Sequence, residues 1–207
     1  MKNKTVLNWT EELINKEGKY TAGSAVSLIA AVSASLAGFI FSLQAGKKKY
    51  TAQESQIQSG IQKAQLLNQD LLELSERDAD AFQPVIPLYQ LAKNTEEERK
   101  IREEKIDQAL IDASKPPYEI ILKLDECLDL YEELIQLELK GTILEDIKIG
   151  LNIVMASIKN AKINSFVNIK EVSNEELREK ESKVILSQYE KSVKKAERLL
   201  ERAESEK

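Results

Sequence analysis

The feature that most constrains this fold is the stretch from Thr21 to Tyr50, which is uncharged until three lysines close to its end. No residue between Ser24 and Ala45 carries a charge, and small side chains recur among aliphatic and aromatic ones. A helix that is apolar on all sides must be surrounded by other elements. The stretch therefore predicts a central apolar helix over about residues 24–46, covered by other helices of a bundle.

A membrane span is the competing interpretation, because the stretch reaches the roughly 20 apolar residues that a span needs. Five serines and Gln44 dilute its hydrophobicity, and the rest of the chain is rich in amphipathic segments that need a core to cover. A signal peptide fits less well, because Glu11, Glu12 and Glu17 lie where a basic region is expected. We therefore expect a cytoplasmic protein without a membrane partner.

The composition favours a single all-α domain over residues 1–207. The chain has only four prolines and seven glycines, 31% of its residues are charged and 5% are aromatic. These proportions favour long helices over strands. A net charge of -5 also argues against nucleic acid as a partner.

The chain contains no histidine and a single cysteine, Cys127. The absence of histidine excludes Ser-His-Asp and Cys-His nucleophile systems and removes the commonest ligand of catalytic zinc. Acid–base chemistry must then use Asp, Glu, Lys, Tyr or water, and no metal is expected. One cysteine cannot form an internal disulfide, and we expect Cys127 to be a small core residue.

A carboxylate lies on the apolar face of the second long helix, which is predicted from about Ala52. The stripe of this helix consists of Ile57, Ile61, Ala64, Leu67, Leu71 and Leu74. One further turn places Asp78 on the same face. A buried carboxylate is unfavourable unless it is paired, hydrogen-bonded or protonated. Asp78 is therefore either a structural partner of a neighbouring helix or a functional group.

Capping boxes and prolines predict the remaining helix boundaries. Thr95 with Glu98 predicts a third helix that runs to about Ser114, and Pro116 and Pro117 predict a break followed by a fourth.

Two further helices are expected towards the end of the chain. Thr142 with Glu145 predicts the start of a fifth helix, and Ser173 with Glu176 predicts a long, strongly charged C-terminal helix from about residue 174.

Five short segments occur in an order that resembles a known enzyme family. They are GSAVSLIAAVSASLAGFIFSLQAGKKKY from Gly23, DADAF at 78–82, KPP at 115–117, ED at 145–146 and NSFVN at 164–168. This order is similar to that of the cyclodeaminase half of formiminotransferase-cyclodeaminase and of its stand-alone relatives, the bacterial methenyltetrahydrofolate cyclohydrolases. The resemblance implies a multihelical up-and-down bundle, a homodimer, and a tetrahydrofolate derivative as substrate, with no cofactor.

The chain departs from the family pattern at several positions. The family loop Pro-Gly-Gly-Gly-Ser aligns with residues 20–24, where only Gly23 and Ser24 match. Ser42 and Glu145 stand where the family usually has Asn and Ser. The altered glycine loop suggests a second hypothesis: the chain is a catalytically inactive family member that binds folate or another ligand. A purely structural helical protein is the third.

The resemblance implies a set of site residues. Both family reactions pass through a tetrahedral carbon beside an amidinium-like charge, for which a buried carboxylate is a suitable counter-ion and a lysine a suitable proton donor. We hypothesise that Asp78 and Asp146 supply carboxylates and that Lys48 is the lysine. The implied substrate-binding residues are Gly23, Ser24, Lys47, Lys49, Asn164 and Asn168. The structural alternatives are an ion pair or a buried hydrogen bond for Asp78. For Asn164 and Asn168 they are helix capping or hydrogen bonds to buried backbone, and for the other residues they are interactions with helix ends.

Geometry constrains this set. Asp146 and Asn164 lie 18 positions apart, roughly 27 Å along one helix. They cannot serve one small site within a single continuous helix. Either the two residues act at different places, or Asp146 of one subunit approaches Asn164 of a second subunit.

Overall fold

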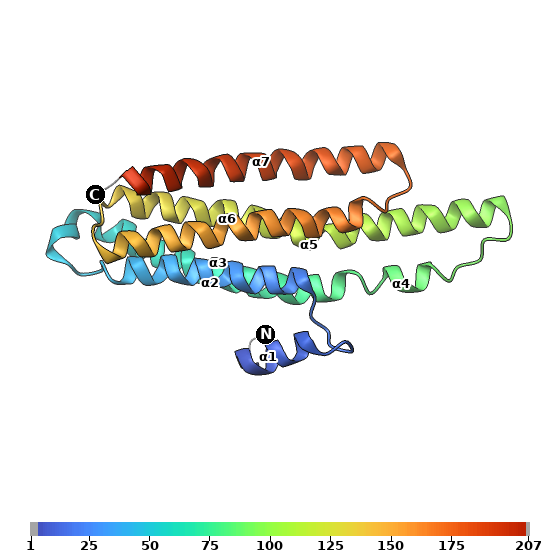
Figure 1. Cartoon of the computed structure of the whole chain (residues 1–207), viewed down its shortest axis with the longest axis horizontal. Helices are drawn as coiled ribbons and strands as arrows, with labels where there is room; N and C mark the ends of the chain where they lie inside the picture. Colours follow the sequence, from blue (N-terminus) through green and yellow to red (C-terminus); the bar gives the residue numbers. More distant parts are fainter. Residues whose placement is uncertain (1–3, 206–207) are drawn as a thin grey trace.

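The computed structural model describes residues 4–205, and every regular element in that range is a helix. The elements are α1 (Val6–Ile14), α2 (Ala22–Ser42), the 3₁₀ helix η1 (Lys48–Gln53), α3 (Glu54–Ala81), α4 (Val85–Leu88), α5 (Glu96–Gln136), α6 (Thr142–Ile169) and α7 (Glu175–Ser205). The long helices run side by side in an elongated bundle, with α4 and the start of α5 projecting beyond its other members (Figure 1). The predicted all-α class is confirmed.

Helix α2 packs against three long helices, α3, α5 and α6. Its small residues allow this close packing, and Ala30, Ala34 and Ala37 are completely buried. The opposite side of α2 is different, because Ile29, Val32 and Phe39 are each about half exposed (52%, 53% and 51%). The described part of this chain therefore leaves one apolar side of α2 uncovered.

Helix α5 is continuous over 41 residues and contains Pro116 and Pro117, so the predicted break between a third and a fourth helix is wrong. A proline inside a helix removes one backbone donor, which leaves the carbonyl four residues earlier without its usual partner. For Pro117 that carbonyl belongs to Ala113, and it accepts a hydrogen bond from Asn168 Nδ2 of α6 at 3.1 Å. A neighbouring helix thus replaces the lost donor.

Of the first two predicted capping boxes, one is present and one is not. At the start of α5, the Glu98 amide donates to Thr95 Oγ1, and the Thr95 amide donates to Glu98 Oε2, both at 3.1 Å. The box predicted at 142–145 is absent, since no side chain caps α6. There Glu145 accepts from Lys148 Nζ at 2.9 Å instead.

Helix α7 begins one residue after the predicted position, and its cap differs from the prediction of Ser173 with Glu176. Asn174 Oδ1 accepts from the Leu177 amide at 3.1 Å. The turn before it is held by the buried Asp107, whose carboxylate accepts from the amides of Ser173 and Asn174 at 2.7 and 2.8 Å. A carboxylate from α5 therefore fixes the start of α7.

Helix α1 lies outside the bundle, beside the start of α2 (Figure 1). It is attached through Trp9, which is 2% exposed and stacks on Tyr20 with ring centroids 4.7 Å apart. Ala79 completes this small apolar cluster. The cluster holds the chain that leads into α2 close to the end of α3.

Candidate functional site

Asp78 lies in the last turn of α3, where the start of α2 and the end of α6 meet it. Its side chain accepts hydrogen bonds from Thr21 Oγ1 at 2.6 Å, from Asn164 Nδ2 at 2.8 Å and from Ser24 Oγ at 3.5 Å. The residue is 7% exposed, and none of these three partners is charged. Asp78 therefore lies on the buried face of α3, as its stripe position predicts, and none of its hydrogen-bond donors is a cation.

Burial raises the pKa of the Asp78 carboxyl above its ordinary value, although the hydrogen bonds from Thr21, Asn164 and Ser24 oppose that change. Desolvation disfavours the charged form, whereas donors directed at the carboxylate favour it. A carboxylate stabilised only by neutral donors still lacks a counter-ion. A cationic group beside this carboxylate would be attracted more strongly than beside a surface carboxylate, because solvent screens buried charges poorly.

Gly23 marks the closest approach to this carboxylate. A Cβ atom at this position would lie 2.0 Å from Asn164 Nδ2 and 2.3 Å from Asp78 Oδ1. Glycine is therefore required here for the contact between Asp78 and Asn164 to form. Together with Ser24, it places two of the predicted binding residues at the candidate site.

The two asparagines of α6 have different surroundings. Asn164 donates to Asp78, whereas Asn168 lies one turn later and donates to the Ala113 carbonyl. The second contact stabilises the helix around Pro117. Of the two, only Asn164 reaches the Asp78 carboxylate.

The other predicted residues lie at the opposite end of the bundle. Lys47, Lys48 and Lys49 lie between α2 and α3, and Asp146 lies in the second turn of α6. Asp78, by contrast, is beside the start of α2 and the end of α6. With 1.5 Å per residue, the 21 residues of α2 separate the two groups by about 30 Å.

The charged groups at this opposite end are only partly engaged. Lys47 Nζ donates to Gln44 Oε1 at 3.1 Å, and Lys49 Nζ donates to the Tyr50 hydroxyl at 2.9 Å. Lys48 is exposed, and within residues 4–205 its side chain makes no hydrogen bond or ion pair. Asp146 is half-buried. This end therefore presents an available ammonium group and a carboxylate, but no deeply buried acid.

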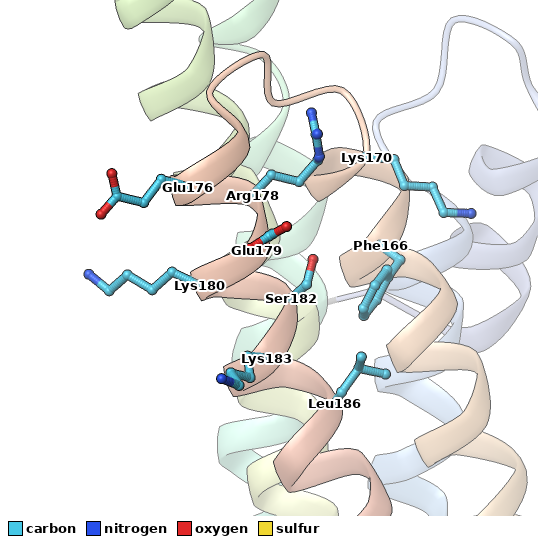
Figure 2. Close-up of a pocket in the computed structure, with 9 residues that line it drawn as sticks. All are labelled: Phe166, Lys170, Glu176, Arg178, Glu179, Lys180, Ser182, Lys183 and Leu186. Carbon is cyan, nitrogen blue, oxygen red and sulfur yellow. The ribbon is translucent and has the colours of Figure 1, made fainter.

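The groove shown in Figure 2 lies between the end of α6 and the start of α7 and has a volume of about 620 Å³. Phe166 and Leu186 project into it, while Glu176 and Lys180 point away (Figure 2). Phe166 is two positions from Asn164, so the two side chains face opposite sides of α6. The groove is therefore separate from Asp78. We place the candidate site at Asp78 because it holds the buried ionisable group that the groove lacks.

The described residues form no cluster of side chains that could bind a metal ion. No group of three or more Cys, Asp or Glu side chains between residues 4 and 205 has the arrangement of a metal centre.

The family model for formiminotransferase-cyclodeaminase matches residues 5–186 of the chain. The chain belongs to this family. The family predicted from the order of short segments is thereby confirmed.

Individual family members give the same result. The chain is 29% identical over 170 residues to a methenyltetrahydrofolate cyclohydrolase of Methylorubrum extorquens, a match that covers 81% of this chain and 80% of the relative. It is 23% identical over 165 residues to a formimidoyltransferase-cyclodeaminase of Gallus gallus, covering 79% of this chain but only 30% of that longer protein.

A solved structure shares the fold. The crystal structure of a formiminotetrahydrofolate cyclodeaminase from Thermotoga maritima matches with a TM-score of 0.78. The match covers 97% of both chains at 20% sequence identity. The helical arrangement is therefore the one found in this family.

Sequence reasoning missed one residue at the site. Thr21 was noted only as a departure from the family's glycine loop, yet its hydroxyl makes the shortest hydrogen bond to Asp78. A signal was present, because Thr is a preferred residue immediately before a helix. That signal predicts that Thr21 caps α2, as it does in the structure. It does not predict the hydrogen bond from the Thr21 hydroxyl to Asp78.

Proposed function

We propose that this chain is a folate one-carbon enzyme. It either hydrolyses 5,10-methenyltetrahydrofolate to 10-formyltetrahydrofolate or cyclises 5-formiminotetrahydrofolate with loss of ammonia. Family membership and the cyclohydrolase relative support the substrate class. The observation that carries the proposal is Asp78, a buried carboxylate whose hydrogen-bond donors are all neutral.

Both reactions need a counter-ion near one carbon atom. In the hydrolysis, water adds to the cationic methenyl carbon, the bond from that carbon to N5 breaks, N5 takes up a proton, and the formyl group stays on N10. In the cyclisation, N10 attacks the formimino carbon and ammonia leaves. Asp78 stabilises the amidinium-like charge in either direction, and its fixed position limits the reorganisation that accompanies the change in charge.

We propose further that the enzyme is a homodimer and that the second subunit completes the site. The exposed apolar stripe of α2 has a counterpart on its neighbour α6, where Ile149, Ile163 and Val167 are 54%, 59% and 60% exposed. Exposed apolar faces of this kind mark interaction surfaces. A second copy covering both stripes would surround α2, as its sequence requires.

An antiparallel arrangement of the two subunits explains why the predicted residues lie in two groups. A two-fold axis perpendicular to α2 places the end of one helix against the start of its copy. Lys48 and Asp146 of one subunit then approach Asp78 of the other. In this arrangement Lys48 is the proton donor, and Asp146 is the base toward water or the amine. Lys47 and Lys49 lie where the glutamate tail of folate would be attracted.

Helix α2 also meets the length and hydropathy criteria for a membrane span, the only helix within residues 4–205 that does so. Half of its most hydrophobic window is buried against the other helices. We propose that its exposed half contacts a second subunit in a cytoplasmic protein. Purification without detergent as a monodisperse dimer is the expected result, and recovery only from membranes would contradict it.

The decisive experiment adds the pure protein separately to methenyl- and formimino-tetrahydrofolate and follows the absorbance of the methenyl group. Loss of absorbance with the first identifies a cyclohydrolase, and gain with the second identifies a cyclodeaminase. Neither change, combined with a higher melting temperature in the presence of folate, identifies the binding-only alternative that the altered loop at Thr21 favours.

A pair of substitutions tests Asp78 itself. We expect Asp78→Asn to lower kcat by about 100-fold or more, because an electrostatic contribution at the reacting centre is lost. Asp80→Asn is the matched control, since Asp80 lies on the same helix, is largely exposed and pairs with Lys19. Circular dichroism checks the fold of both. Full activity of a folded Asp78→Asn variant would end the proposal.

A further inference from the structure

The Thr21 hydroxyl makes three hydrogen-bond contacts at the start of α2, one of them with Ser24 Oγ at 3.3 Å. Its Oγ1 atom accepts from the Ser24 amide at 3.3 Å, which caps the helix, and donates to Asp78 Oδ2 at 2.6 Å. A hydroxyl has one hydrogen and two lone pairs. The Ser24 amide occupies one lone pair and the Ser24 hydroxyl can donate to the other, so the single hydrogen points at the Asp78 carboxylate, the nearest of the three partners.

The bond to Asp78 has the length of a charge-assisted O–H···O⁻ interaction. It is the shortest contact of that carboxylate, and Ser24 Oγ reaches the same oxygen only at 3.5 Å. The other oxygen accepts from Asn164. Thr21 is thus the principal donor to Oδ2, and it approaches from the segment that begins α2.

Among the described residues, the influences on the pKa of Asp78 are its burial and its neutral hydrogen-bond donors, and no charged side chain is one of them. Helix α2 itself has no charged residue. Several charged side chains of the adjoining segments are paired with other groups: Lys19 with Glu76 and Asp80, Glu76 with the Tyr20 hydroxyl, Arg77 of α3 with Glu119 of α5, and Lys162 of α6 over the Phe166 ring. The ionised form of Asp78 therefore depends on its neutral donors.

We infer that Thr21 is a positioning residue for the proposed reaction: its hydroxyl holds Asp78 ionised and in one orientation. This inference rests on the proposed function, in which Asp78 is the counter-ion of the reacting carbon. A protonated Asp78 would lose that role. Replacing the hydroxyl by a methyl group removes the donor while keeping the size of the side chain, so the proton should bind Asp78 more tightly.

The test compares Thr21→Val and Thr21→Ser with the wild type. The first readout is the titration of the Asp78 carboxyl, followed by the carbon NMR signal of labelled aspartate without substrate. Thr21→Val should move the midpoint upward by about one pH unit, the size expected for losing a hydrogen bond to a charged group. Thr21→Ser, which keeps the hydroxyl, should restore it.

The second readout is the pH profile of kcat/KM, whose acidic limb should move upward by the same amount in Thr21→Val. Thr95→Val is the control, because Thr95 caps α5 in the same way but has no contact with Asp78. It should lower the melting temperature without moving either midpoint. This separates the loss of a helix cap from the loss of the donor to Asp78.

Two outcomes would overturn the inference: an unchanged Asp78 midpoint in Thr21→Val, or a failure of Thr21→Ser to restore the wild-type value. A wild-type chain that turns over neither folate would end the proposed function instead. In that case the NMR titration, which needs no turnover, would still decide whether Thr21 keeps Asp78 ionised.

Discussion

At the scale of single residues, Gly23 is the position where the least atomic change should have the largest effect. Gly23→Ala adds a Cβ that would overlap Asn164 Nδ2 and both carboxylate oxygens of Asp78. We expect the contact between Asp78 and Asn164 to break and kcat/KM to fall by at least about tenfold, because the proposed counter-ion is displaced.

The matched control is Gly38→Ala, the same substitution on the same helix. Its Cβ would meet only the Cβ of Ala64, at 3.0 Å. We expect a small change in melting temperature and no change in KM or kcat. Equal kinetics for Gly23→Ala and the wild type would show that the approach of α2 to Asp78 is irrelevant to turnover.

The raised pKa of Asp78 also predicts how stability depends on pH. A folded-state pKa above the ordinary 3.8 means that the folded protein binds this proton more tightly than the unfolded chain. The contribution to stability is therefore fully present below pH 3.8 and is lost as the pH rises through the folded-state value. Thermal unfolding should show the wild type losing stability relative to Asp78→Asn over this window. A difference that is constant with pH would contradict burial as the cause.

Asp78 could be predicted from the sequence because an acidic residue on a 3.6-residue apolar stripe conflicts with burial. Its partners could not. Asn164 lies 86 positions away, and Thr21 lies 57 away, immediately before the start of α2. Such contacts depend on how helices pack against one another, which local periodicity does not encode.

At the scale of helices, α5 shows how tertiary contacts override a local rule. Pro116 and Pro117 predict a helix boundary, yet both are buried inside a continuous helix. Asn168 explains this, because its side chain donates to the Ala113 carbonyl, for which Pro117 has no backbone N–H. The same asparagine was predicted to bind substrate, since an amide side chain by itself does not reveal whether its partner is a ligand or the backbone.

This contact predicts a coupling between two helices. Asn168→Ala leaves the buried Ala113 carbonyl without a partner and should lower the free energy of unfolding by about 1–3 kcal/mol. Pro117→Ala restores a backbone N–H at position 117, so Asn168→Ala should cost less in that background. Urea unfolding of the four combinations measures the coupling.

Asn152→Ala is the control for that cycle. The Asn152 amide also donates to a backbone carbonyl, that of Lys148 at 2.9 Å, but it is exposed and lies within one helix. Its removal should change stability by no more than about 0.5 kcal/mol. Strictly additive effects of Asn168→Ala and Pro117→Ala would mean that the side chain does not substitute for the missing N–H.

At the scale of the whole molecule, the proposed acid and base groups are divided between the two ends of the bundle. The spacing of 18 residues along a single helix predicts this division without any structure, because helical rise is nearly constant. The sequence could not predict which side of α2 stays exposed. That depends on which sides α3, α5 and α6 occupy, and their packing leaves the stripe with Ile29, Val32 and Phe39 uncovered.

A site shared between subunits predicts that two inactive variants restore each other. Asp78→Asn and Asp146→Asn each remove one carboxylate from every site of their own homodimer. If the subunits are mixed in equal amounts after unfolding and refolded together, half of the dimers combine both variants, and one of the two sites in each keeps both carboxylates. About a quarter of the wild-type activity should therefore return.

The variants refolded separately and then mixed are the control. If both carboxylates acted within one subunit, or if Asp146 had no role, the co-refolded mixture would be no more active than the average of its parts. A Phe39→Glu substitution in both chains should abolish the recovery, because it places a charge on the proposed interface and prevents the subunits from pairing.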